Sequence, residues 1–573
     1  MSGAPHAASI TVRETLDLLD GALAEVASGI TEDRYALWLG SGISLGRIPG
    51  LKLLIRNALE HLQGQVVVAD PDCRFRSAIT EILSTAAGLS PAECATIDVH
   101  QPVANWPNID AVVQRLASNY ARFLEIGVAG EPDDYILWTG ADLPNVFADP
   151  NAEPDAEHLC IGLLILEGIA SRIASANWDG LIEKAVSELS PGTDALVVCV
   201  TGADLRQPQR QAFLYKFHGC AVRARDDEAN FRHLIIARLS QINAWRDDQK
   251  NAAMVARLVD LAVSHETLMI GLSAQDSNIQ TVFTAAENQM GWPWPSHPPA
   301  YAFSEDRLGV DQRALLRNVY RGSFTPANRD AIYQSALIRA YAKPLLTALV
   351  LHVLCAKLCR LVDLAPGGLG IPDSTAIKEG LKHLRNALGS HPDAGAAAFI
   401  RMIVAHTSRL TALYHTGDAT ASDLPYLPIT SRPVQAMGAD PMVATAGLRE
   451  LAVGLSLLGL GQRDGSWALQ PSALPASDQG ALRIVTSTNN LKLIFASNAQ
   501  AAIRLGANGH IGPDDDVIVV HSQQVLPAMP RSPRATRGRL GRPGRRDVSV
   551  TELLDSAANA NELFDAFRKA AGI

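Results

Sequence analysis

Cysteine is scarce in this chain of 573 residues, which has only seven, at no regular spacing. An odd number spread thinly over a long chain excludes the disulfide framework of small secreted proteins and is typical of a reducing cytoplasm. No Cys-x-x-Cys pair occurs, so the sequence offers no thiolate set for a structural zinc, and we expect no metal. Cys355 and Cys359 lie one helical turn apart, and we interpret them as small core residues.

Long uninterrupted apolar runs are missing as well. The most apolar stretch, Pro344 to Val362, is interrupted by His352, Lys357 and Arg360, which favours a buried helix over a membrane span. The first 26 residues contain no basic segment followed by an apolar one, so we expect no signal peptide. These two features and the cysteine usage together predict a cytoplasmic protein without a membrane contact.

An excess of positive charge is also lacking, because the formal net charge is −9. The molecule as a whole is therefore not a general nucleic-acid binder. One segment departs from this balance: Arg531 to Arg546 holds seven arginines and no acidic residue, among glycine and proline. We expect a loop there, and it is either a solvated linker or a contact with nucleic-acid phosphates or an acidic partner.

The chain alternates short apolar runs with amphipathic segments, which predicts an α/β fold with a largely parallel sheet. The expected strands lie in the following stretches: RYALWLG, RIASANW, DALVVCV, AFLYKFHG, ETLMIGLS and PAYAFS. Later stretches predict a second, mixed region of strands and helices: ALRIVTS, LKLIFAS and DDVIVVHS are its expected strands. No repeat period is present.

These patterns divide the chain into four parts. We predict an N-terminal helix within residues 1–30 (at 11–28), an α/β domain over 31–315 with a helical insertion at about 52–165, a helical connector and Pro/Gly linker over 316–372, and a C-terminal mixed helical and α+β domain over 373–573.

The first expected strand runs into a glycine-rich turn, YALWLGSGISLGRIPG. Gly40 and Gly42 would let the chain turn sharply and let phosphate oxygens approach backbone N–H groups. The spacing is not that of the dinucleotide fingerprint G-x-G-x-x-G, and the P-loop signature is absent, so a standard dehydrogenase is not predicted. Taken alone, the turn is equally consistent with a glycine-rich loop after a core strand.

Three further strand ends carry polar residues. Asn177 and Asp179 follow the second strand, where open α/β sheets bind ligands, although Asp179 could simply cap the next helix. His218 follows an apolar run and precedes a glycine, a place where a lone histidine is often structural. The stretch IGLSAQDSNI contains Gly271, Ser273 and Asp276. These three residues follow a buried strand and precede a helix, as in an ordinary βα turn.

In this order the four features resemble the sirtuin (SIR2) family over roughly residues 31–305. GSGIS resembles the family's GAGIS, ANWDGLIEKA its TNYD segment and KFHGC its K[LF]HG, while GLSAQDSNI resembles the GYSxxDxxI of bacterial SIR2-like proteins. The resemblance implies a Rossmann-like domain that binds NAD+ as its substrate. It implies that the first loop holds the phosphates and ribose through Gly40, Ser41, Gly42 and Ser44. It further implies that Asn177 contacts the nicotinamide ribose and orients a water, that Asp179 lies beside the nicotinamide, and that His218 is the catalytic base. The loop that holds the other end of the dinucleotide would contain Gly271, Ser273 and Asp276.

Two departures from the deacylase pattern point away from protein deacylation. The zinc-binding Cys-x-x-Cys pairs are missing, and LGRIPGLKLL keeps Ile-Pro but lacks the Asp-Phe-Arg of the family's GIPDFR. Zinc-less SIR2-like domains joined to an unrelated C-terminal region resemble bacterial anti-phage effectors that hydrolyse NAD+ to nicotinamide and ADP-ribose. Such a protein is expected to form a homo-oligomer or to act with a HerA-type ATPase or a short Argonaute. The alternatives are a non-catalytic NAD or ADP-ribose sensor in a defence complex, and an NAD-dependent deacylase or ADP-ribosyltransferase.

Overall fold

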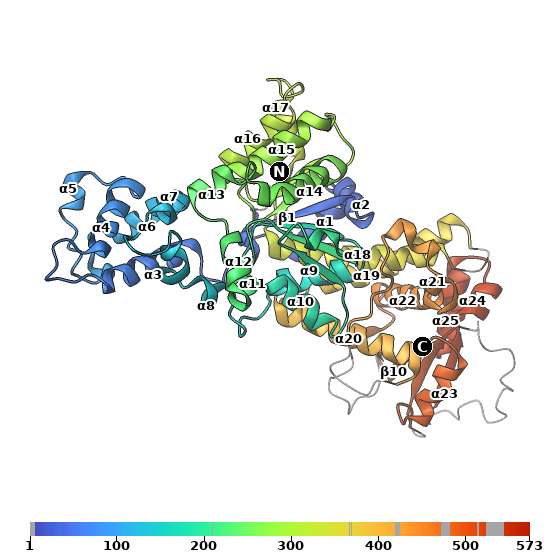
Figure 1. Cartoon of the computed structure of the whole chain (residues 1–573). Helices are drawn as coiled ribbons and strands as arrows, with labels where there is room; N and C mark the ends of the chain where they lie inside the picture. The colour runs from blue at the N-terminus through green and yellow to red at the C-terminus, as the bar shows by residue number, and fades with distance from the viewer. Residues whose placement is uncertain are drawn as a thin grey trace.

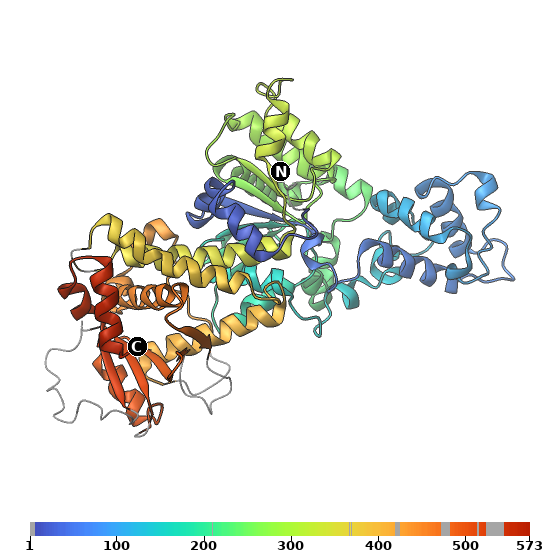
Figure 2. The same cartoon turned by 180° about the vertical axis from the view of Figure 1, so that it is seen from behind.

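A computed structural model describes the chain over residues 6–208, 210–365, 367, 369–418, 425–471, 482–512, 515–522 and 544–573. The described chain has three parts (Figure 1): a central α/β part, a helical lobe that projects from it, and a C-terminal part. From behind, the lobe and the C-terminal part lie at opposite ends of the molecule (Figure 2).

The central part is built on a parallel sheet of seven strands in the order β3-β4-β2-β1-β5-β6-β7. Its strands are β1 Tyr35–Leu39, β2 Arg172–Ser175, β3 Leu196–Cys199, β4 Ala212–Lys216, β5 Glu266–Ile270, β6 Tyr301–Ser304 and β7 Leu337–Ile338. The predicted α/β, Rossmann-like fold class is confirmed, and six of these strands lie in the predicted stretches. The sheet continues past residue 315, where we placed the end of the domain, because α16 (Val310–Val319) crosses that position and β7 follows it.

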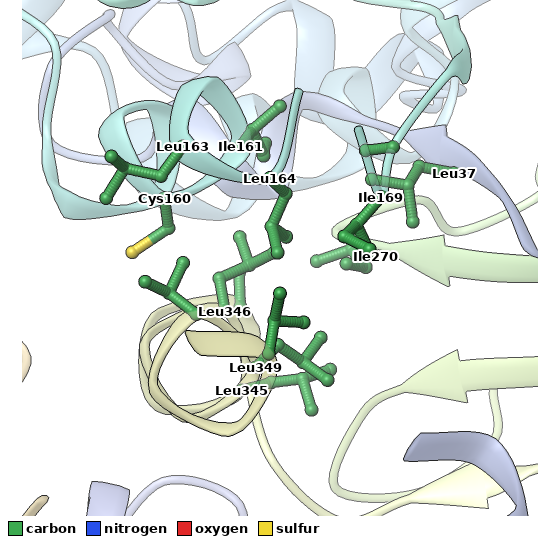
Figure 3. Close-up of a cluster of buried hydrophobic side chains, with 14 of the residues drawn as sticks. Leu37, Cys160, Ile161, Leu163, Leu164, Ile169, Ile270, Leu345, Leu346 and Leu349 are labelled. Atoms are coloured by element: carbon green, nitrogen blue, oxygen red, sulfur yellow. The ribbon is translucent and has the colours of Figure 1, made fainter. Parts of the chain in front are cut away.

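Both faces of this sheet are covered, which is why its strands are apolar on both sides. On one face lie α1 (Val12–Asp20), α2 (Ala24–Thr31), α9 (Ala156–Leu166), α10 (Leu181–Leu189) and α18 (Ala342–Asp363). Figure 3 shows leucine and isoleucine side chains of α9 and α18 meeting Leu37 and Ile270 of the sheet. On the other face lie α14 (Ala252–Ser264), α15 (Ser277–Met290), α16 and α17 (Arg329–Ser335).

The N-terminal segment differs from the single helix that we expected at 11–28. The chain breaks at Gly21, whose backbone leaves the helical region, and a second helix begins at Ala24. Both helices pack on the apolar core beneath the sheet.

The helical lobe is the predicted insertion between β1 and β2. Its helices are α3 Leu51–Gly64, α4 Arg74–Glu81, α5 Pro91–Cys94, α6 Ile109–Ser118, α7 Tyr120–Glu125 and α8 Leu143–Phe147. They enclose a core of their own, which also receives alanines from α11 (Ala221–Asp226). Two more short helices, α12 (Glu228–Phe231) and α13 (Leu239–Ala244), lead from there to α14.

The C-terminal part combines long helices with a second, mixed sheet of order β12-β11-β10-β9-β8. Its helices are α19 Ile371–Gly389, α20 Ala397–Thr416, α21 Pro441–Thr445, α22 Leu448–Arg463, α23 Ala499–Ala507, α24 Val550–Ser556 and α25 Ala560–Ala571. Its strands are β8 Ala468–Pro471, β9 Leu482–Val485, β10 Asn490–Ala496, β11 Val517–His521 and β12 Arg545–Ser549. The predicted mixed helical and α+β character is confirmed, and β8 and β12 were not predicted.

The arginine-rich segment that we expected to form a loop lies outside the described residues from 531 to 543. Its last two arginines belong to β12 instead, and both have acidic partners: Arg545 pairs with Asp547 (2.6 Å) and Arg546 with Asp516 (2.5 Å).

Helix α18 connects the central and C-terminal parts, and it is the stretch that composition alone might place in a membrane. Within the described residues it is the one helix long and apolar enough for a span, and 67% of its apolar window is buried inside the protein. It packs against α9 on one side and α19 and α22 on the other. The prediction of a buried helix is confirmed.

Candidate active site

The predicted site residues meet at the carboxyl ends of four strands of the central sheet. The turn Gly40–Ser44 follows β1, Asn177 and Asp179 follow β2, His218 follows β4, and Gly271 to Asp276 follow β5. Because β4, β2, β1 and β5 are neighbours in a parallel sheet, these loops lie side by side at one edge.

The glycines of the first and last of these loops pack backbone to backbone. The N–H of Gly40 donates to the carbonyl of Ile270 and that of Gly42 to the carbonyl of Gly271, both at 3.1 Å. Gly271 has φ +63°, and a Cβ there would stand 2.8 Å from Gly42 Cα and from Ile43 N. The two loops thus form one close-packed glycine cradle, in which a Cβ at Gly271 would collide with the neighbouring backbone.

Gly271→Ala is therefore expected to cost more stability than an ordinary loop substitution. A left-handed residue with a side chain costs about 1–2 kcal/mol, and forcing extra atoms into a filled space adds about 1–3 kcal/mol. Gly46→Ala is a matched control, because Gly46 has φ +83° with open space around it. Urea unfolding of the two variants should show the larger loss for Gly271→Ala, and equal losses would contradict the close packing.

Asn177 is buried and joins the first loop to the second strand. Its Nδ2 donates to the carbonyl of Gly40 at 3.2 Å and lies 3.5 Å from Ser44 Oγ, while its own backbone N–H donates to Ser175 Oγ. Its Oδ1 is buried and accepts no hydrogen bond from the described residues. An acceptor in this state costs free energy unless a ligand or water satisfies it.

The two carboxylate oxygens of Asp179 have different partners. Oδ1 accepts the N–H of Leu181 at 3.1 Å and so caps the start of α10, as the structural interpretation required. Oδ2 accepts the hydroxyl proton of Ser44 at 3.0 Å and so belongs to the candidate site. The N–H of Leu181 at the start of α10 orients the Asp179 carboxylate, and this carboxylate in turn orients the Ser44 hydroxyl.

His158 completes this network from α9. The N–H of Asp155 donates to His158 Nδ1 at 3.2 Å, so the neutral ring carries its proton on Nε2, which lies 3.1 Å from Ser44 Oγ. Burial lowers the pKa of His158, and the charges of Asp179 and Asp155 oppose this. The polar chain His158–Ser44–Asp179 is thus ordered, with each hydrogen in a defined place.

Lys216 supports the same loop from below. Its ammonium is fully buried, pairs with Glu183 at 2.8 Å and donates to the carbonyls of Asp179 and Trp178. Burial opposes the charge, but Glu183 and other nearby negative groups raise the pKa of Lys216 above its ordinary value, and the ammonium stays charged. Lys216 therefore holds the backbone on both sides of the Asp179 side chain.

His218 is buried just after β4 and is held by a residue from helix α15. Asn278, at the start of α15, directs its Nδ2 at His218 Nε2 over 2.7 Å, while its Oδ1 accepts the N–H of Ile279. The two nitrogens are within hydrogen-bond distance, and this contact fixes the orientation of the imidazole. Burial lowers the pKa of His218 below its ordinary value, with opposing contributions from Asp276 and Asn278, so the imidazole is neutral at pH 7.

The remaining predicted residues lie at the margin of this cluster. Ser41 and Ser273 are exposed, and the Ser273 hydroxyl accepts the N–H of Gln275 in its own loop. The Asp276 carboxylate accepts the phenol proton of Tyr120 at 2.6 Å, which ties the β5–α15 loop to α7 of the helical lobe. The structure therefore places Asp276 in a contact between the lobe and the site.

Sequence reasoning did not single out His158, Asn278 or Tyr120. Asn278 lies in the motif IGLSAQDSNI, two residues after Asp276. A polar residue at a helix start directly after a strand loop was the sequence signal that could have identified it. His158 lies in an apolar helix, where a single histidine has no local signature. Within the described chain, no three His, Cys, Asp or Glu side chains gather in an arrangement that could hold a metal ion.

Comparison with known families agrees with this geometry. A family model described as a SIR2-like domain matches residues 171–321, from β2 to just beyond α16. No curated protein matches the chain with significant similarity. The matched range contains Asn177, Asp179, His218 and Gly271, and the Gly40–Ser44 turn precedes it but packs directly on Gly271. The chain therefore carries a SIR2-like domain.

Proposed function

We propose that this protein hydrolyses the nicotinamide–ribose bond of NAD+ and releases nicotinamide and ADP-ribose. SIR2-like domains use NAD+, and the residues present fit that substrate. The observation that carries the proposal is the buried Asn177 amide: its Nδ2 lies 3.5 Å from Ser44 Oγ, which is joined to Asp179 and His158, and its Oδ1 has no partner among the described residues. A neutral, oriented histidine follows the neighbouring strand, so the site has both a ribose anchor and a base.

The chemistry suits these residue types. Breaking the bond between C1′ and the nicotinamide nitrogen builds oxocarbenium character, and nicotinamide leaves as a neutral molecule without an acid. The main tasks of the protein are to hold the dinucleotide and to place water at C1′. The glycine cradle suits the phosphates, Asn177 the ribose and water, and His218 the proton that water loses as its oxygen bonds to C1′.

The experiment is direct. Purified protein is incubated with NAD+, and nicotinamide and ADP-ribose are followed by chromatography, with and without an acetyl-lysine peptide. We expect both products in equal amounts without the peptide. Turnover only with the peptide would select the deacylase, and binding of NAD+ without turnover under any condition would select the sensor.

Asn278 is expected to set the acid limb of the pH–rate profile. Because burial lowers the pKa of His218, the wild-type rate should hold as pH falls through the ordinary histidine value of about 6.5 and decline only below it. Asn278→Asp places a carboxylate beside the imidazole and favours its protonated form, so the acid limb should move to higher pH. Asn278→Leu should lower the rate roughly tenfold to hundredfold, a part of the 10²–10⁴ that a general base contributes, without that upward shift.

A role confined to folding would leave the acid limb of Asn278→Asp where the wild type has it. Circular dichroism and the thermal midpoint of both variants show whether the fold is retained. An unchanged profile in a folded Asn278→Asp protein would separate Asn278 from the base.

We further propose that the enzyme is a cytoplasmic anti-phage effector that stays inactive until a trigger arrives, because unrestrained loss of NAD+ would kill the cell that makes it. Oligomerisation, a HerA-type ATPase or a short Argonaute are the candidate triggers. The Tyr120–Asp276 contact supports a route for such control, since movement of the helical lobe would reach Asp276, two residues before Asn278.

A further inference from the structure

A pocket separate from the candidate active site lies at the edge of the central sheet, beside β7. It has a volume of about 990 Å³ and is bounded by α1, the turn between α1 and α2, the loop from β6 to α16, α17 and β7. None of the candidate active-site residues lines it. This volume is at the upper end of the range for small-molecule sites.

Three arginines line this pocket, and all are exposed: Arg307 after β6, Arg313 on α16 and Arg339 after β7. Over the described ranges none of the three forms an ion pair, although most other arginines near the central sheet do. Unpaired guanidinium groups from three separate segments around one concavity create a positive potential, in a chain whose net charge is −9.

Against the three arginines the lining contains one acid, which reduces this potential but does not cancel it. The one acid in the lining, Asp306, accepts the N–H of Ala7 at 2.9 Å and lies 3.4 Å from His6. On α1, Asp17 pairs with Arg13 and Asp20 pairs with Arg385. The pocket therefore keeps an excess of positive charge for an anion from solution, although Arg313 Nε donates to the carbonyl of Gly309 at 3.4 Å.

We propose that this pocket binds a nucleotide through its phosphate groups and that the bound nucleotide regulates the SIR2-like site. Guanidinium groups pair with phosphate in a bidentate way, and apolar side chains in the same lining, Leu18, Leu23, Tyr333 and Leu337, offer a surface for a base. The concave shape and limited volume favour a free nucleotide over a nucleic-acid duplex, whose phosphates follow an extended, convex surface.

One buried side chain connects this pocket with the candidate active site. Gln312 on α16 accepts the N–H of Gly309, in the pocket lining, at 2.9 Å, and donates to the carbonyl of Leu272 at 3.0 Å. Leu272 directly follows Gly271 of the glycine cradle. A shift of the β6–α16 loop on nucleotide binding therefore reaches the cradle through two hydrogen bonds of one amide, and by linkage a ligand at the cradle must change nucleotide affinity by the same factor.

The binding half of the proposal is tested by calorimetric titration with ATP, pyrophosphate and adenosine. We expect ATP and pyrophosphate to bind, with affinity that falls as salt rises, and adenosine to bind at least tenfold more weakly. The triple variant Arg307→Ala, Arg313→Ala, Arg339→Ala should lose ATP affinity at least tenfold. Arg317→Ala is the matched control, because Arg317 is exposed on the same helix outside the pocket, and it should bind as the wild type does.

The same titration in Asn177→Ala distinguishes the pocket from the active site. ATP binding that survives Asn177→Ala and is lost in the triple variant supports the pocket, whether or not the protein hydrolyses NAD+. Binding lost in Asn177→Ala, binding unaffected by the triple variant, or a preference for a DNA duplex over ATP would each overturn it. A triple variant that fails to fold is replaced by the single substitutions, each expected to weaken ATP severalfold.

The regulatory half rests on NAD+ binding to the SIR2-like site, as proposed above. ATP should change the NAD+ affinity of the wild-type protein severalfold, and Gln312→Met, of similar length, should retain ATP binding and lose that effect. Absence of coupling in a wild-type protein that binds both ligands would overturn the regulatory role alone. Absence of NAD+ binding would instead contradict the proposed function and leave the pocket intact.

Discussion

Asn177→Ala and His218→Ala are each expected to abolish NAD+ turnover while leaving a folded protein. Loss of a general base lowers a rate by about 10²–10⁴, and loss of a single preorganised polar contact to the reacting group lowers it by about 10²–10³. His218, just after β4, is the neutral and oriented base of the proposed mechanism. Asn177 donates its Nδ2 hydrogen to Gly40 of the first loop, and its Oδ1 is the proposed acceptor for the ribose. Either loss should therefore bring turnover close to the detection limit of a nicotinamide assay.

Two matched controls separate chemistry from folding. His233 and Asn105 are exposed residues of the same domain, and their alanine variants should retain wild-type rates. Thermal midpoints and circular dichroism of all four variants should stay close to the wild type, since the two site residues lie at strand ends outside the apolar clusters. Full activity in both Asn177→Ala and His218→Ala would refute the site assignment.

The sheet could be predicted from sequence where burial leaves a simple signal. Strands covered on both faces appear as continuous apolar runs, and β1 (YALWL) and β5 (ETLMI) are buried at every position. Strand β7 was not predicted because it has only two residues, Leu337 and Ile338. Its place at the sheet edge comes from pairing with β6. A pair of apolar residues carries no periodicity, so only tertiary contact defines it.

The candidate site could also be predicted in part from the sequence. Glycine, Asn-x-Asp and Lys-x-His-Gly patterns directly follow predicted strands, and parallel topology brings strand ends together. The residues that orient these groups are set by distance in space: His158 reaches Ser44 from α9, and Asn278 reaches His218 across two intervening strands. Local sequence contains no information on such contacts, because each partner is an ordinary residue in its own helix.

A buried ion pair links the central part with the connecting helix α18, and it carries the largest expected effect on stability. Lys357 of α18 is fully buried and lies 2.6 Å from Glu167 Oε2, just before β2. Its ammonium also donates to the carbonyls of Glu167 and Thr430. The other oxygen of Glu167 accepts the phenol proton of Tyr426 and the N–H of Ile429, so every polar group of the pair is satisfied.

Lys357→Met is expected to lower the free energy of unfolding by about 3–5 kcal/mol, the usual cost of breaking a buried pair by removing one partner. The reason is that Glu167 would be left charged in an apolar interior with only two neutral donors. Burial already lowers the pKa of Lys357, and the charge of Glu167 opposes this, so the ammonium depends on its partner as much as the carboxylate depends on the lysine. Urea unfolding followed by tryptophan fluorescence measures the loss.

The double variant Lys357→Met, Glu167→Gln tests the cause of that loss. The introduced side-chain amide would keep an acceptor for Tyr426 and Ile429 and would remove the unpaired charge, so the double variant should recover a large part of the stability that Lys357→Met loses. Lys382→Met is the control, because Lys382 forms an exposed pair with Glu379 and should cost no more than about 1 kcal/mol. An equally small loss of unfolding free energy in Lys357→Met and Lys382→Met would contradict this prediction. Glu167 would then take up a proton or reach water, and the ion pair would not be what holds the segment around Thr430 against the start of β2.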